Sequence, residues 1–88
     1  MKKTRSWLFA RNRKGEKGLW WAVVRQAAHD LLFSHESEAL DALEWLRLTG
    51  VWVVGELGAD EGAYKKEIAR LVLLRERRTG ERLPIERL

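Results

Sequence analysis

The chain of 88 residues has 45% hydrophobic and 34% charged residues, a single proline and a formal net charge of +4. A chain of this length supports one hydrophobic core, and this balance of apolar and charged residues excludes a disordered or low-complexity segment. The sequence contains no cysteine, which excludes a disulfide framework, a thiolate zinc site and a cysteine nucleophile.

Charge is unevenly distributed along the chain. Residues 1–18 carry a net charge of +6, residues 19–62 a net charge of −6, and residues 63–88 a net charge of +4. Such a surface attracts a polyanion or pairs acidic with basic faces between subunits. The chain has one Asn, one Gln and one Met, and this scarcity of heat-labile side chains is typical of heat-adapted proteins.

No segment of the sequence is a candidate membrane span or signal peptide. The longest apolar run, residues 19–24, is far shorter than the roughly 20 residues that a span requires. The apolar stretch near the N-terminus is also too short for a signal peptide. We therefore expect a cytoplasmic protein with one domain over residues 1–88, a basic N-terminal arm at 1–5 and an extended C-terminal tail at 80–88.

The first third of the chain is predicted to form strands. Residues 6–11 are short and aromatic and precede the polar run 12–18, which predicts a strand followed by a loop. Residues 19–26 combine aromatic and β-branched side chains, which predicts a second strand paired with the first as a hairpin. Residues 31–33 are predicted to form a short third strand.

A helix over residues 19–33 is the alternative interpretation of this segment. Apolar side chains also recur there at helical spacing, and the sequence Gln26-Ala27-Ala28 suits a helix better than a strand. The side chains at that spacing are Trp20, Val23, Val24, Ala27 and Leu31. The strand remains the preferred interpretation because of the aromatic and β-branched content.

A helix and a further strand are predicted next. Ser34 can cap a helix over residues 35–48, whose apolar side chains cluster on one face. Gly50 stands where a left-handed residue would end that helix. Residues 51–54 are then predicted to form a buried strand.

A second helix is predicted from Asp60, which can cap it, to the residues before Gly80. Its apolar stripe consists of Tyr64, Ile68, Leu71, Val72 and Leu74. Pro84 excludes further helix in the tail. The predicted order is β-β-(β)-α-β-α, and the expected fold class is α+β: a two-layer sandwich of a small, mostly antiparallel sheet of three or four strands with two helices.

No motif in the sequence points to an enzyme, a cofactor or a small-molecule substrate. The glycines within residues 55–62 lack the spacing of a phosphate-binding loop, and carboxylates surround them. His29 and His35 each stand beside a carboxylate but without the spacing of a metal motif. We therefore expect a non-enzymatic protein without a cofactor or metal.

The five tryptophans suggest both core and interface positions. Trp21 and Trp52 lie in apolar segments and are expected in the core. Trp45 projects nearly opposite the apolar face of the first predicted helix, beside Asp41 and Leu48, and an exposed Trp beside a Leu is typical of a protein contact. We expect Trp45, Leu48 and Asp41 to form an interface, most simply that of a homodimer. Packing of Trp45 against the C-terminal tail is the alternative.

A second surface combines cations with aromatic side chains. Trp7 and Phe9 share one face of the first predicted strand, and cations flank them, as on surfaces that bind single-stranded nucleic acid. Further cations form a stripe on the second predicted helix. The residues of this surface are Arg5, Trp7, Phe9, Arg11, Arg13, Lys14, Lys66, Arg70 and Arg77. The preferred function is a protein-interaction module, and a nucleic-acid-binding accessory protein is the alternative.

Overall fold

The computed structural model describes residue 8 and residues 15–87, and every regular element in that part of the chain is helical. The elements are α1 (Gly15–Phe33), α2 (Glu36–Trp45), the π turn η2 (Leu46–Gly50), α3 (Val51–Glu56), α4 (Glu61–Thr79) and the 3-10 turn η3 (Ile85–Arg87). The expected α+β sandwich is therefore wrong, because the described residues contain no strand and no sheet.

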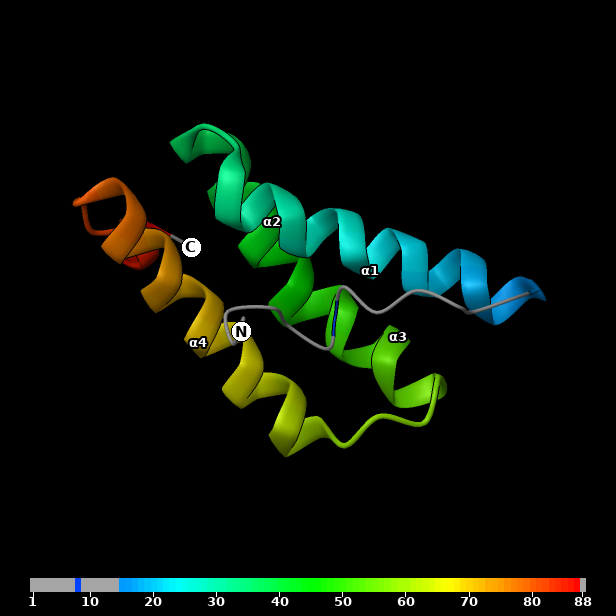
Figure 1. Cartoon of the computed structure of the whole chain (residues 1–88). Coiled ribbons are helices and arrows are strands. Elements are labelled where there is room, and N and C mark those ends of the chain that lie inside the picture. Colours follow the sequence, from blue (N-terminus) through cyan, green and yellow to red (C-terminus); the bar gives the residue numbers. More distant parts are fainter. Residues whose placement is uncertain (1–7, 9–14, 88) are drawn as a thin grey trace, which may run out of the picture.

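The helices enclose a single core. α1 and α2 form a hairpin, α3 continues the line of α2 through η2, and α4 packs against α1 and α3 (Figure 1). Buried side chains from all four α-helices meet in this core, and Leu83 joins them from the C-terminal segment. The first predicted strand, residues 6–11, lies outside the described residues apart from Leu8, which is buried in the core. No helix in the described part is long and apolar enough to cross a membrane.

α1 occupies the segment in which two strands were predicted, residues 19–26 and 31–33. Its buried side chains include Trp21, Val24 and Ala28, which follow one another at steps of three and four residues. This is the period of a helix face and not the alternation of a strand. The helical interpretation of this segment is confirmed, because the burial pattern overrides the strand propensity of its aromatic and β-branched residues.

Gly50 does not end the helix that precedes it. Its backbone is right-handed helical, with φ −58° and ψ −35°, so the predicted left-handed stop and the predicted strand at 51–54 are both wrong. The absence of a side chain serves a close approach instead, because a Cβ on Gly50 would lie 2.4 Å from the Tyr64 hydroxyl oxygen. The helical segment therefore continues through η2 into α3.

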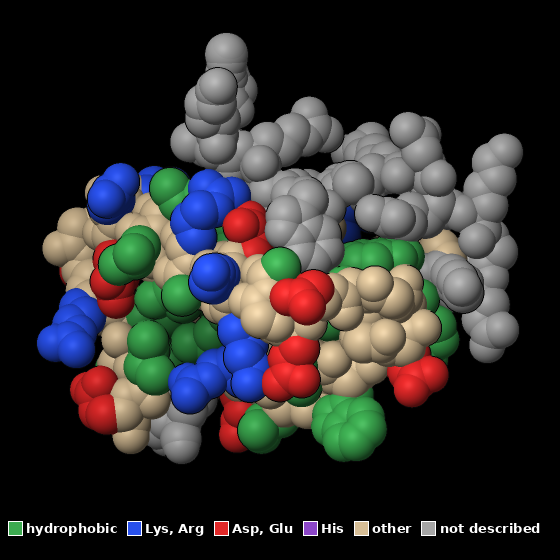
Figure 2. Space-filling view, turned by 90° about the horizontal axis from the view of Figure 1, so that it is seen from below, with side chains coloured by type: hydrophobic (Ala, Val, Ile, Leu, Met, Phe, Trp, Pro, Cys, Tyr) green, Lys and Arg blue, Asp and Glu red, His purple; other side chains and the backbone are tan. Residues whose placement is uncertain are grey.

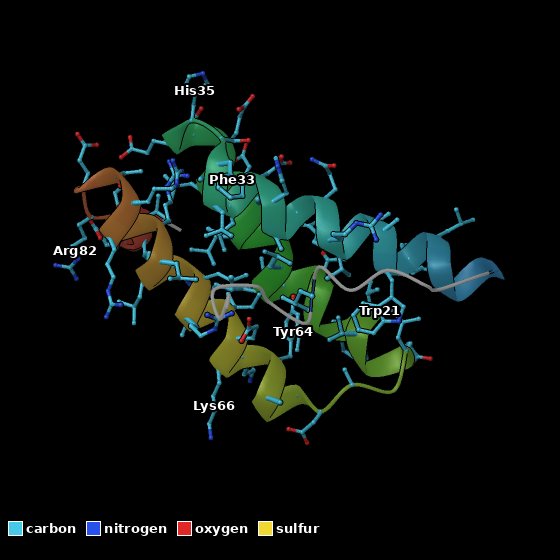
Figure 3. All side chains as sticks on the ribbon, in the orientation of Figure 1. Trp21, Phe33, His35, Tyr64, Lys66 and Arg82 are labelled. Atoms are coloured by element: carbon cyan, nitrogen blue, oxygen red, sulfur yellow. The ribbon has the colours of Figure 1, made fainter. Side chains whose placement is uncertain are left out.

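The Tyr64 hydroxyl holds α4 against the π turn. It donates a hydrogen bond to the carbonyl oxygen of Leu46, with 2.6 Å between the two oxygens. Tyr64 points from α4 toward the segment of α2, η2 and α3 (Figure 3), and it is 1% exposed. Burial raises the pKa of this hydroxyl, because the charged form would lose its hydration.

The predicted second helix is confirmed as α4. The Asp60 carboxylate accepts a hydrogen bond from the backbone N–H of Ala63 at 2.8 Å, and Gly80 follows the helix in the left-handed conformation with φ 75°. The predicted apolar stripe faces the core: Tyr64, Ile68, Leu71 and Val72 are buried and Leu74 is partly buried. Beyond Gly80 the chain is non-helical at 82–84 and then forms η3. The expectation that Pro84 excludes further helix in an extended tail is therefore wrong, because a proline restricts the residue before it and not the turn after it.

The predicted helix over residues 35–48 is confirmed as α2, with a different cap. The residue at the N-cap is His35, whose side chain makes no capping hydrogen bond. The Ser34 hydroxyl donates instead to the Asp30 carboxylate at 3.3 Å. The α1–α2 turn is therefore fixed by a side-chain contact back to α1.

Two of the tryptophan predictions have opposite outcomes. Trp21 is 6% exposed and lies in the core, as predicted. Trp52 is 74% exposed, so its predicted core position is wrong. In a helix Val54 and Trp52 lie on different faces, and it is Val54 that is buried.

Candidate functional site

A groove runs between α1 and α2 on one side of the hairpin and has a volume of about 540 Å³. Each helix contributes side chains spaced three or four residues apart, because this spacing places them on one face. The lining consists of Val23, Gln26, Ala27, Asp30 and Ser34 from α1 and the turn after it, and of Glu38, Asp41, Ala42 and Trp45 from α2. We call this feature the α1–α2 groove.

Four side chains give the α1–α2 groove its apolar floor: Val23, Ala27, Ala42 and Trp45. Val23 is 44% exposed, and Trp45 is partly buried against the core. The Trp45 ring also lies beside η2, since its Cζ3 atom is 3.2 Å from the position that a Cβ on Gly50 would take. Trp45 is therefore held in place by the fold and still contributes to the groove.

The polar lining of the α1–α2 groove is acidic. Asp30 accepts hydrogen bonds from the Gln26 amide at 3.0 Å and from the Ser34 hydroxyl at 3.3 Å, which fix its carboxylate. Glu38 and Asp41 are exposed. The described lining includes no Lys or Arg, so the groove presents a negative potential around an apolar floor.

The structure brings together two of the three predicted interface residues. Asp41 and Trp45 both line the α1–α2 groove. Leu48 does not line it and lies one turn further on, 64% exposed. Trp52 follows four residues later and is also exposed, and we call these two exposed apolar side chains the Leu48–Trp52 pair.

Val23 and Ala27 are groove residues that the sequence prediction missed. They belong to α1, in a segment for which strands were preferred. Their separation of four residues was already part of the helical interpretation of that segment, so the signal was present in the sequence. This spacing identifies a groove only when α1 and α2 are known to pack together.

The predicted nucleic-acid surface is described only in part. Its N-terminal members, which are Arg5, Trp7, Phe9, Arg11, Arg13 and Lys14, lie outside the described residues. On α4, Lys66 and Arg77 are exposed. Arg70 is bound by Glu67 through two hydrogen bonds, with Nε–Oε1 and Nη2–Oε2 distances of 3.1 and 2.6 Å. These bonds raise the pKa of Arg70 and direct its charge toward Glu67.

The outer face of α4 also carries apolar side chains. Ala69 and Leu73 lie between Lys66 and Arg77 at helical spacing, and Leu73 is 54% exposed. We call these four residues the α4 stripe. It has an apolar centre with one open cation toward each end.

Two other arginines of α4 close the C-terminal end of α1. Arg75 is buried, and its Nη1 donates to the carbonyl oxygen of Leu31 at 2.9 Å. Arg78 donates to the carbonyl oxygen of Leu32 and lies over the Phe33 ring, 5.0 Å from its centroid. The dipole of α4 favours cations near its C-terminal end, and these two arginines also satisfy free carbonyls at the end of α1.

A second cleft of about 490 Å³ lies beside these arginines, between the α1–α2 turn and the C-terminal segment. Its lining combines Arg75, Arg78 and Arg82 with Glu36, Glu38 and Glu81. Figure 3 shows Arg82 and His35 near this end of the bundle. The charges of these six side chains balance, and two of the cations are bound to α1.

The two histidines lie in different surroundings. The His29 ring packs against Phe33 with 4.9 Å between centroids, and His35 is exposed at the start of α2. Within the described part of the chain, no group of three or more His, Cys, Asp or Glu side chains is placed to hold a metal ion.

Comparisons with protein-family models, with curated proteins and with solved structures find no match for this chain. The function of the chain is therefore inferred from the geometry of its own residues.

Proposed function

We propose that this protein is a small cytoplasmic interaction module that binds protein surfaces, in the first place those of other copies of itself. The observation that supports this proposal is the α1–α2 groove, in which Asp41 lies beside an apolar floor that includes Trp45. The proposed function of the groove is binding, which requires no catalytic side chain in its lining.

The floor of the groove has the properties of a binding centre. A tryptophan that is already held by the fold loses little conformational freedom when a partner covers it, and such aromatic anchors carry much of the energy of protein interfaces. A stable interface covers about 800 Å² on each partner, so the contact extends beyond the groove. Trp20, 46% exposed and three residues before Val23 on α1, offers apolar surface for this extension.

Nucleic-acid binding is a second candidate function, and one observation favours it. Lys66 and Arg77 are both exposed on the outer face of α4, as a surface that follows phosphates requires. The engagement of Arg70 by Glu67 weakens this surface. We therefore rank this function below protein association.

Light scattering on a size-exclusion column tests the proposal over a range of protein concentrations. We expect a mass above the 10.3 kDa of one chain that rises with concentration. A wild type that stays monomeric throughout would refute self-association. A mass increase that requires a single-stranded oligonucleotide and disappears at high salt would support the second candidate.

A substitution in the floor locates the contact. Val23→Glu places a carboxylate in the groove, at a position exposed enough to leave the fold intact, and should reduce association. Leu48→Glu makes a comparable change outside the groove. If Leu48→Glu loses association and Val23→Glu does not, the contact lies at the Leu48–Trp52 pair and not in the groove.

A further inference from the structure

We infer that the α1–α2 groove of one copy binds the α4 stripe of a second copy, so that the molecules associate head to tail. This inference depends on the self-association proposed above. It adds the identity of the two surfaces and the symmetry of the contact.

Contact between two identical grooves is unfavourable. A two-fold interface places the same surface patch on both partners. The carboxylates of Asp30, Glu38 and Asp41 would then lie against the same acidic lining of the other copy, with no Lys or Arg in the described lining to separate them. Like charges that meet in this way oppose association, so the groove requires a partner of opposite charge.

The α4 stripe has the complementary charge and polarity. Lys66 and Arg77 are open cations, and Ala69 and Leu73 form an apolar surface between them. Lys66 projects away from the other helices (Figure 3). Figure 2 views the molecule from below and shows Lys and Arg side chains with both hydrophobic and acidic side chains beside them. A helix with an apolar centre between cations suits an apolar groove with an acidic rim.

The α1 side of the groove and the α4 stripe have similar lengths. The α1 side of the groove extends over eleven residue steps, from Val23 to Ser34, and the α4 stripe extends over eleven steps, from Lys66 to Arg77. At 1.5 Å per residue each is about 16 Å long. With one cation of the stripe at Asp30 and Glu38, near the α1–α2 turn, Leu73 can meet the apolar lining further along the groove.

This arrangement predicts how association depends on concentration and salt. After the first contact the dimer keeps one unoccupied groove, on one copy, and one unoccupied stripe, on the other, so growth continues past the dimer unless a ring closes. We expect the mass to rise above twice 10.3 kDa with concentration. Raising the ionic strength from about 0.05 M to about 0.5 M should lower it, because the paired charges become screened.

Charge reversal at each surface provides the decisive experiment. The groove variant is Glu38→Lys with Asp41→Lys, and the stripe variant is Lys66→Glu with Arg77→Glu. Each should be monomeric alone, at a concentration where the wild type associates. Mixing the two should restore association at one-to-one stoichiometry, because each retains the surface that the other has lost. Restored association would also show that both variants are folded.

Matched controls separate this contact from a general effect of charge. Glu56→Lys with Glu86→Lys, and Arg47→Glu with Arg82→Glu, make the same charge changes at exposed residues outside both surfaces. Both controls should associate like the wild type.

Three results would overturn the inference while leaving self-association in place: a stripe variant that associates alone, a groove variant that associates alone, or controls that also become monomeric. A monomeric wild type would instead refute the proposed function itself.

Discussion

The contact between Gly50 and Tyr64 predicts that substitutions at these two positions are strongly coupled. Alanine at position 50 would place its Cβ 2.4 Å from the Tyr64 hydroxyl oxygen and 3.2 Å from Trp45 Cζ3, whereas ordinary contacts begin at 3.4 Å. Tyr64 cannot retreat freely, because it is buried and its hydroxyl is held 2.6 Å from the Leu46 carbonyl oxygen. We therefore expect Gly50→Ala to destabilise the protein by about 1–3 kcal/mol, the usual cost of overpacking.

The effect of Gly50→Ala should be reversed once the hydroxyl is removed. Tyr64→Phe alone leaves the Leu46 carbonyl without this donor and should cost about 1–3 kcal/mol. In that background the atom closest to the new Cβ is absent, and replacing a helical glycine by alanine contributes about 0.5–1 kcal/mol of stability. Gly50→Ala should then be neutral or stabilising. The coupling between the two substitutions is therefore about 1–4 kcal/mol.

Urea unfolding of the wild type, both single variants and the double variant measures this coupling, with far-UV circular dichroism as the signal. Gly55→Ala is the matched control, because Gly55 lies in α3 and a Cβ there has nothing within 4 Å. It should stabilise the wild type by about 0.5–1 kcal/mol. Additivity of Gly50→Ala and Tyr64→Phe to within about 0.5 kcal/mol would refute the steric explanation.

Three further predictions concern single side chains. The raised pKa of Tyr64 contributes stability that is fully present below the ordinary tyrosine pKa of about 10 and is lost as the pH rises above it. The free energy of unfolding, measured at increasing alkaline pH, should show this loss in the wild type and not in Tyr64→Phe. Arg75→Met should cost about 1.5–3 kcal/mol in urea unfolding, because it removes a buried charged donor, whereas Arg77→Met at an exposed position should change stability by less than about 0.5 kcal/mol. Asp60→Ala should lower the thermal unfolding midpoint, because it loses a cap that stabilises the protein by about 1 kcal/mol. His35→Ala is the control, since His35 makes no capping hydrogen bond. Equal effects of the two substitutions would contradict the prediction.

The part of the fold that sequence predicted correctly is the part whose signals are local. Asp60, Gly80 and the apolar stripe between them specify α4 without reference to any other element. For residues 19–33 two local signals conflicted, strand propensity and helical spacing, and packing of the helical face decided between them.

The role of Gly50 could not be found from local signals. A glycine after an amphipathic helix commonly ends it, but here the glycine admits a tyrosine from a helix that begins eleven residues later. The same limit applies to the candidate site. Asp41 and Trp45 were identified from one helix, whereas Val23 and Ala27 became part of the groove only through the packing of α1 on α2.

The guanidinium groups at the end of α4 have a consequence for the order in which the protein assembles during synthesis. The last carbonyls of α1 receive hydrogen bonds from Arg75 and Arg78, which are 44 and 46 residues further along the chain. A nascent hairpin of α1 and α2 lacks these donors, and it also lacks the core side chains of α4, including Tyr64. We expect the newly made hairpin to open repeatedly on the ribosome, and to become stable only after α4 has left the exit tunnel.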